Sequence, residues 1–163
     1  MKKLILVISF IFFIVGCTKQ IPEGEKKISK SVEETNVIST IDNFISAYNS
    51  NDIEKAVTFL DLNYKGVVTD SDNVVDILEA KNALYSLMNH YPDGKWKVKC
   101  EEVNISGEFA YVMTIGSFMV LDPIENKIIP VYSERSIRIL KKQKEGSWKI
   151  FRYIAVPAFT YEQ

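Results

Sequence analysis

The order of the helices is set by residues 37–60, which read VISTIDNFISAYNSNDIEKAVTFL. In the first half, large apolar side chains recur at intervals of three and four, which is the spacing of one face of a helix. They are Val37, Ile41, Phe44, Ile45 and Tyr48. The polar run at residues 49–52 ends this helix, and Asn51 with Glu54 resembles a capping box that starts a second one. The second helix is short and carries Ile53, Ala56, Val57 and Leu60.

The remainder of the chain changes from helical to strand spacing at Gly94. Before that residue come a β-prone run over residues 64–69, a polar turn over 70–73 and a third amphipathic helix that ends at residues 91–94. After it, a period of two predicts strands over residues 95–105, 108–121, 128–140 and 148–156. Helices followed by a meandering antiparallel sheet indicate an α+β fold. Long strands that are apolar on both faces predict a curved sheet wrapped over the helices.

Residues 1–16 have the features of an export signal rather than of a folded element. Two lysines precede residues 4–15, whose apolar run is shorter than the roughly twenty residues of a stable membrane span. It ends in residues 14–17, IVGC, which resemble the bacterial lipobox. The resemblance implies a diacylglyceryl group on Cys17 and cleavage just before it. The alternative is an ordinary signal anchor in which this cysteine is incidental.

Acyl chains on Cys17 would hold the protein to a lipid bilayer, on the exported side of the cell membrane or the outer membrane. Residues 17–35 mix Lys and Glu with Pro and Gly, so we expect a lipidated cysteine followed by a flexible tether. Lipidation of Cys17 leaves Cys100 without a disulfide partner. Its position in a strand of alternating pattern predicts a half-buried, inert side chain.

The composition excludes several classes of function. Lys and Arg number 20 against 21 Asp and Glu, which leaves no overall basic field to attract nucleic acid. Two Cys and one His are too few for a zinc cluster or a disulfide scaffold. None of the seven Gly stands in a GxGxxG or GxxxxGK nucleotide-binding loop. We therefore expect no nucleic-acid partner, no metal and no cofactor.

Three stretches in order resemble the nuclear-transport-factor-2-like (NTF2-like, or SnoaL-like) domains. Residues 44–53, FISAYNSNDI, resemble the end of that family's first helix and the break after it. Residues 136–141, SIRILK, and 146–150, GSWKI, resemble its last two strands. The resemblance covers a domain at residues 36–158, before a tail at 159–163. It implies a cone in which three N-terminal helices pack in the concave face of a curved antiparallel sheet.

The resemblance does not extend to the catalytic groups of the family's ketosteroid isomerases. Those enzymes use a helix tyrosine and a protonated carboxyl as an oxyanion hole, and a second carboxylate as the base. In this chain Phe44 stands at the tyrosine position, Arg135 or Ser136 stands at the acid position, and Asp70 is offset from the base position. Dehydratases of this fold use a His–Asp pair, but we expect His90 to be exposed at a helix end. We therefore assign no catalytic residue, and the balance is against an enzyme.

Aromatic and arginine side chains are the candidates for a ligand pocket between the helices and the sheet. The candidate pocket residues are Tyr48, Tyr64, Trp96, Tyr111, Arg135 and Arg152. The alternative is that most of the aromatic residues are core. Arg135 and Arg152 lie in neighbouring strands, so they either face an anionic group together or lie on the outer face of the sheet.

Charge divides the domain into two halves. Residues 31–94 carry a net charge of −8, and residues 128–156 carry +5. The basic patch predicted along the closing hairpin consists of Arg138, Lys141, Lys142, Lys144 and Lys149. Such a patch suits an acidic envelope partner, although lysines also keep a hairpin soluble and protect strand edges.

These observations favour a non-enzymatic, membrane-anchored envelope lipoprotein that binds a small apolar ligand or an envelope protein. One alternative is an enzyme of the SnoaL-like type that uses Asp70 or Tyr64 with Arg135 or Arg152. Another is a self-association module, a homodimer formed through the convex face of the sheet, as the resemblance implies.

Overall fold

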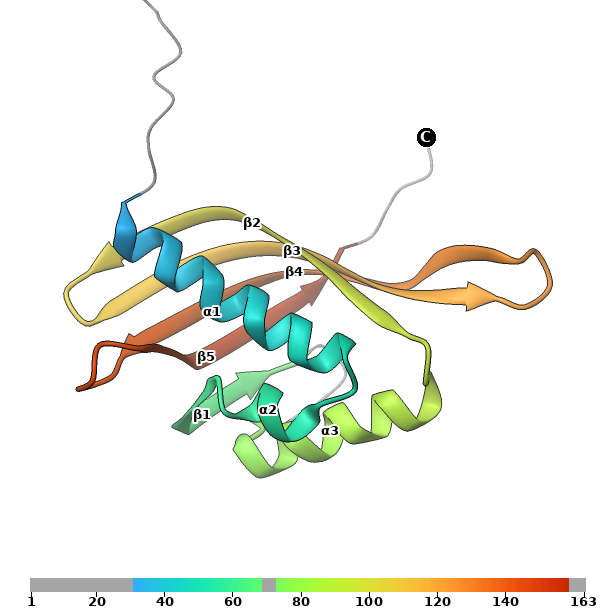
Figure 1. Ribbon diagram of the computed structural model, residues 1–163, viewed down its shortest axis with the longest axis horizontal. Coiled ribbons are helices and arrows are strands. Elements are labelled where there is room, and N and C mark those ends of the chain that lie inside the picture. Colours follow the sequence, from blue (N-terminus) through green and yellow to red (C-terminus); the bar gives the residue numbers. More distant parts are fainter. Residues whose placement is uncertain (1–30, 69–72, 159–163) are drawn as a thin grey trace, which may run out of the picture.

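The computed structural model describes residues 31–68 and 73–158, in which three helices lie on one face of a five-stranded sheet (Figure 1). The elements are α1 (Val32–Asn49), α2 (Ile53–Val57), β1 (Leu60–Val67), α3 (Ile77–His90), β2 (Lys95–Ser106), β3 (Phe109–Asp122), β4 (Lys127–Lys142) and β5 (Trp148–Pro157). The predicted α+β class and the change to strands after Gly94 are confirmed.

The sheet has the strand order β1-β5-β4-β3-β2. Strands β2 to β5 form the predicted antiparallel meander, with hairpins between neighbours in the chain. The predicted curved antiparallel sheet is confirmed, and β1, for which the sequence predicted no partner, joins its edge by pairing in parallel with β5. After β1 the chain passes through α3 to the opposite edge of the sheet, so β1 meets the last strand rather than the next one.

Three irregularities interrupt the long ladders, one between each pair of neighbouring meander strands. They fall between Cys100 and Glu102, between Phe118 and Met119, and between Ile139 and Leu140. Such bulges bend a strand and increase its twist. The sheet is accordingly curved, and its concave face receives the helices (Figure 1).

Two clusters of buried side chains hold the helices to the concave face. The larger joins α1 to the sheet and contains Val37, Ile41, Leu60, Val112, Leu140, Trp148 and Ile150. The smaller contains Tyr48, Ile53 and Phe118, where α1, α2 and β3 meet. Val37 and Ile41 have no exposed surface, so each contributes about 1.5–3 kcal/mol through burial.

Helix α1 begins at Val32, so the predicted tether through residue 35 is four residues too long at its end. Ser31 caps the helix and forms a capping box with Glu34. Glu33 accepts hydrogen bonds from Trp148 Nε1 (3.0 Å) and Lys142 Nζ (2.8 Å). These caps and contacts, rather than apolar spacing, extend the helix.

The break between α1 and α2 differs in detail from the prediction. Asp52, not Asn51, is the N-cap of α2, and it accepts from the backbone N–H of Lys55. Asn51 has a φ of 62°, the left-handed conformation that lets the chain turn sharply. Glu54 contacts α3 instead of capping, through Lys81 at 2.6 Å.

Several predictions concern parts of the chain outside the described residues. They are the signal at residues 1–16, lipidation of Cys17, the tether up to residue 30, Asp70 and the tail at 159–163. Within residues 31–68 and 73–158, no helix has the length and apolar character needed to cross a membrane. Cys100 is half-buried and packs against the core, as expected.

Candidate functional site

A cavity of about 470 Å³ lies between the helices and the concave face of the sheet. Its lining is predominantly apolar. Helices α1 and α3 contribute Phe44, Ile45, Ala80, Ala83, Leu84 and Leu87, and the sheet and its loops contribute Leu60, Tyr64, Val68, Val75, Trp96, Phe118, Tyr132, Glu134, Arg138, Ile150 and Tyr153. Cavities of this size and character hold small organic molecules in other proteins.

Trp96 is fixed in the lining by the last residue of α1. The side-chain amide of Asn49 donates to the backbone oxygen of Trp96 and accepts from its N–H, both at 2.8 Å. The indole then packs against Phe118, with ring centres 5.3 Å apart, and meets Tyr132 edge-on at 6.0 Å. The aromatic wall is therefore held by backbone hydrogen bonds and does not depend on ligand for its position.

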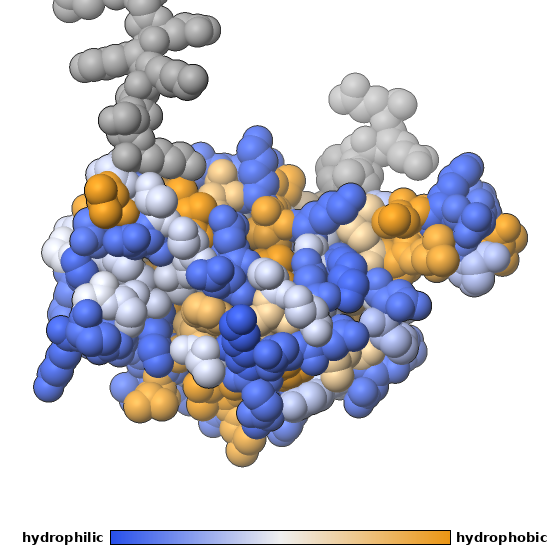
Figure 2. Space-filling model, viewed as in Figure 1, coloured by the Kyte–Doolittle hydropathy of each residue, from blue (hydrophilic) through white to orange (hydrophobic). Residues whose placement is uncertain are grey.

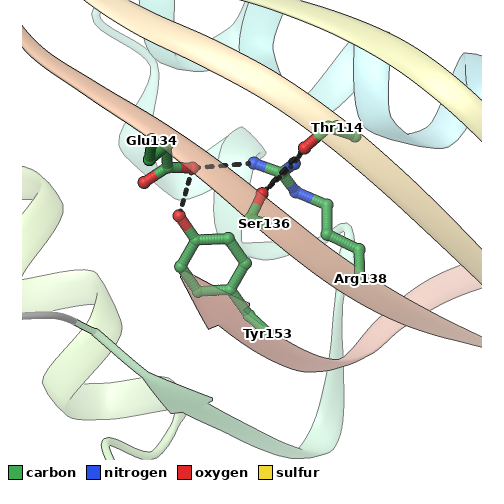
Figure 3. A network of polar contacts seen from close by, with 5 residues as sticks. All are labelled: Thr114, Glu134, Ser136, Arg138 and Tyr153. Atoms are coloured by element: carbon green, nitrogen blue, oxygen red, sulfur yellow. Dashed lines mark hydrogen bonds and ion pairs between the residues drawn. The ribbon is translucent and has the colours of Figure 1, made fainter. Parts of the chain in front are cut away.

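A group of polar side chains lies on the inner face of β3, β4 and β5 (Figure 3). This polar cluster consists of Thr114, Glu134, Ser136, Arg138 and Tyr153. Arg138 Nη1 donates to Thr114 Oγ1 and, at 2.9 Å, to Ser136 Oγ, while Arg138 Nη2 lies 3.7 Å from Glu134 Oε1. The same oxygen of Glu134 accepts the hydroxyl proton of Tyr153. Glu134 and Arg138 are 3% and 4% exposed, so this is a buried ion pair that faces the cavity.

Both tyrosines of this region keep their protons at neutral pH. Burial raises the pKa of Tyr64 to about 12. Burial, reinforced by the neighbouring charge of Glu134, raises the pKa of the Tyr153 hydroxyl well above its usual value of 10.0. The cavity therefore offers the Tyr64 hydroxyl as a donor, whereas Tyr153 already donates to Glu134, whose carboxylate accepts.

No protein-family model matches the chain, and no curated protein matches it. Solved structures do share its architecture. A ketosteroid isomerase-like protein from Erwinia carotovora has a TM-score of 0.64 and 16% identity, over 80% of this chain and 100% of that one. A proposed dehydratase of the NTF2-like family from Streptomyces avermitilis has a TM-score of 0.65 and 14% identity, over 78% and 97%. The chain has the NTF2-like fold.

A third similar structure carries the other name in use for this architecture. It is a domain of unknown function with a cystatin-like fold from Nostoc punctiforme, with a TM-score of 0.68 and 12% identity over 82% of both chains. Identities this low establish the fold and not the activity. The expected NTF2-like cone is confirmed, and its function has to be argued from the cavity.

Two of the four aromatic candidates for the pocket line the cavity, and two do not. Tyr64 and Trp96 line the cavity of the NTF2-like cone. Tyr48 is core: it is 2% exposed and packs edge-on against Phe118. Tyr111 is placed away from the cavity by the strand alternation, because its neighbours Ala110 and Val112 are the buried residues.

The two candidate arginines do not meet in the cavity, so the hypothesis that they bind one anion there is wrong. Arg135 is exposed and donates to Glu101 Oε2 at 2.6 Å. Arg152 stacks over the Phe151 ring, 3.5 Å from its centre, and donates to the backbone oxygen of Asn63. Both arginines are satisfied by contacts outside the cavity, which also removes the alternative enzyme that required them beside Tyr64.

The five residues of the predicted basic patch do not form one exposed surface. Arg138 is buried in the polar cluster and not on the surface. Lys142 is paired with Glu33 of α1, and Lys141 lies over the rings of Phe109 and Phe151. The remaining members are Lys144, which is exposed, and Lys149, which is half-buried.

The residue that the sequence did not identify is Glu134. The acid of the isomerase resemblance was sought at Arg135 or Ser136, but the buried carboxyl of β4 stands at Glu134, one position earlier. The alternation of Glu134, Ser136 and Arg138 with other residues would have indicated a shared face. Phe44 does line the cavity, and His90 lies exposed at the end of α3. No three potential metal ligands gather among the described residues.

Proposed function

We propose that this protein binds a small, largely apolar molecule in the cavity of its NTF2-like domain and does not transform it chemically. The observation that carries the proposal is the aromatic and aliphatic lining of a 470 Å³ space in a domain this small. An unfilled apolar cavity is destabilising, because its lining atoms lose dispersion contacts. A ligand of matching size restores those contacts.

The polar cluster supports binding over catalysis. A general base works best when its pKa lies near the operating pH, yet burial raises the pKa of Tyr64 to about 12 and the pKa of Tyr153 well above its usual value. Glu134 already accepts from Tyr153 and is paired with Arg138. The second candidate function, an enzyme, rests on the presence of this carboxylate in the cavity. Turnover of a bound molecule, abolished by Glu134→Gln, would establish it.

The binding proposal is tested by native mass spectrometry of residues 18–163, which include the whole described fold, purified from the organism that encodes the protein. We expect an added mass that corresponds to a small organic molecule. Ala83→Phe, which places a ring in the cavity lining, should remove it. Asn82→Phe, at the adjacent exposed position of α3, is the matched control. Retention of the ligand by both variants would contradict the cavity as the site.

We further propose that the domain acts at a membrane, held there by acyl chains on Cys17 and serving as an envelope lipoprotein. The support is the lipobox-like sequence before the domain. Radiolabelled palmitate should enter the full chain and not its Cys17→Ser variant, and the variant should leave the membrane fraction. If both forms were labelled equally, the assignment would be wrong. Lys144 and Lys149 remain candidates for contact with an acidic envelope partner.

We also propose that two copies pair through the face of the sheet that no helix covers. That face carries exposed Ile154 (47%) and Val156 (55%), and Leu121 and Ile128 are also exposed. The last two lie at the β3–β4 end, which projects beyond the rest of the sheet (Figure 1) and has apolar surface (Figure 2). The same face has both signs of charge, including the Glu101–Arg135 pair. A two-fold axis can therefore place unlike charges of the two copies together. Light scattering should give twice the monomer mass, and a monomer at high concentration would refute pairing.

A further inference from the structure

One oxygen of the buried carboxylate in the cavity is unused. Glu134 Oε1 accepts from Tyr153 and faces Arg138, whereas Oε2 points away from both (Figure 3) and has no hydrogen-bond partner among the described residues. Glu134 is 3% exposed and lines the cavity. Among the described residues the enclosed side-chain atom without a partner is the Tyr48 hydroxyl, so Glu134 Oε2 keeps surface that a molecule in the cavity can reach. A carboxylate oxygen is an acceptor, so it is suited to a donor that the ligand brings.

A second unused group lies nearby. No described residue forms a hydrogen bond with the Tyr64 hydroxyl, although Tyr64 lines the cavity and its pKa responds to the charges of Arg138 and Glu134. Its position depends on Gly66, since a Cβ at that residue would lie 2.5 Å from the hydroxyl oxygen. A hydroxyl both donates and accepts, so it can complement a donor bound to Glu134.

The charges of the site argue against an ionic ligand. A carboxylate would meet Glu134, and it would find no available cation because Arg138 is bonded to Thr114 and Ser136, paired with Glu134 and stacked 5.0 Å from the Tyr153 ring centre. An ammonium would find the charge of Glu134 already balanced by that arginine. Either ion would also lose its hydration on entry without a free counter-charge. A neutral donor avoids both penalties.

From this geometry, and resting on the proposed binding function, we infer that the ligand is an uncharged alcohol or phenol with an apolar body. Its hydroxyl donates to Glu134 Oε2 and exchanges a hydrogen bond with Tyr64. Its body occupies the space between Phe44, Trp96 and Phe118. Glu134 and Tyr64 thus recognise the hydroxyl group of the ligand, and the aromatic residues pack against its apolar body.

Four probes with one common body test the inference: biphenyl, biphenyl-4-methanol, biphenyl-4-carboxylate and biphenyl-4-methylamine. Their affinities for residues 18–163 can be measured by calorimetry at pH 7. We expect the alcohol to bind about tenfold more tightly than biphenyl, because a hydrogen bond to a charged acceptor is among the stronger ones. The acid and the amine should bind more weakly than the alcohol by a similar factor.

Single substitutions test whether Tyr64 and Glu134 bind the hydroxyl group of the probe. Tyr64→Phe should reduce the affinity for the alcohol about fivefold and leave that for biphenyl unchanged. Tyr111→Phe, away from the cavity, is the control and should change neither the affinity for the alcohol nor that for biphenyl. Glu134→Gln should abolish the advantage of the alcohol over biphenyl. Circular dichroism checks its folding, and Tyr64→Phe provides the test if that variant unfolds.

The outcomes separate the two proposals. If biphenyl binds and the alcohol is no tighter, or if the acid or amine is tightest, the inference about the head group is overturned while cavity binding stands. If neither the alcohol nor biphenyl binds, both are overturned. A preference for the alcohol that survives Tyr64→Phe and Glu134→Gln would also overturn the inference.

Discussion

The two faces of strand β4 carry neighbouring charged residues with opposite fates. Glu134 points to the helices and is buried with Arg138, whereas Arg135, the next residue, points outward and pairs with Glu101 in contact with solvent. The pairs involve similar chemical groups, yet only the inner one lines a cavity. In this sheet the face on which a charged residue lies, and not its type, determines whether it lines the cavity or contacts solvent.

The largest expected difference between the two faces is in the free energy of unfolding when an arginine of one face or the other is replaced. Arg138→Met leaves Glu134 buried without its cation, which should lower the free energy of unfolding by about 3–5 kcal/mol. Arg135→Met breaks an exposed pair and should cost less than about 1 kcal/mol. Urea unfolding followed by circular dichroism measures both. Equal losses would show that the faces do not differ as described.

Alkaline pH probes the inner face through Tyr64. Burial raises the folded-state pKa of Tyr64 from 10.0 to about 12, so its contribution to stability is complete below pH 10 and is lost as the pH rises toward 12. The loss attributable to this residue is about 2 kcal/mol. The difference between the wild-type and Tyr64→Phe unfolding free energies should therefore change over this interval. A constant difference from pH 9 to 12 would contradict the burial of an ionisable hydroxyl there.

A charge placed on the outer face tests the proposed pairing. Ile137 alternates with the buried Ser136 and Arg138, so Ile137→Lys puts an ammonium on the uncovered face. We expect the substituted protein to be monomeric by light scattering, with its unfolding free energy changed by only about 0.5 kcal/mol. Lys144→Ala, in the β4–β5 turn, is the control and should leave the association unchanged.

The smallest expected effect concerns the helix that covers the inner face. Hydrogen bonds from Lys142 and then Trp148 lower the pKa of Glu33, so its contribution is present at neutral pH and is lost as the pH falls through the lowered pKa. Glu33→Gln should therefore lower the melting temperature slightly at pH 7 and not at acid pH. Glu34→Gln, which preserves a capping side chain, is the comparison. An equal decrease at both pH values would point to loss of packing instead.

Much of the fold was predictable because it rests on local spacing. The apolar intervals of Val37, Ile41 and Tyr48 predicted a helix, and all three are buried. The cavity was only partly predictable. Tyr64 and Trp96 were recognised as candidates. Glu134 was passed over, because the resemblance assigned the acid to Arg135 or Ser136, and an offset of one or two residues along the strand is enough to miss the carboxyl.

By itself, the sequence determined the α+β class, the order of its elements and the change of period at Gly94, since these depend on contacts between residues close in the chain. The tertiary structure decided the pairing of β1 with β5 and the division of Glu134, Arg135 and Arg138 between two environments. The physical reason is that a period of two identifies the inner face only when the outer face is polar. Here the inner face of β4 carries Glu134, Ser136 and Arg138 while its outer face carries Ile137, so the helices and the bulges, and not the pattern, determine which side is enclosed.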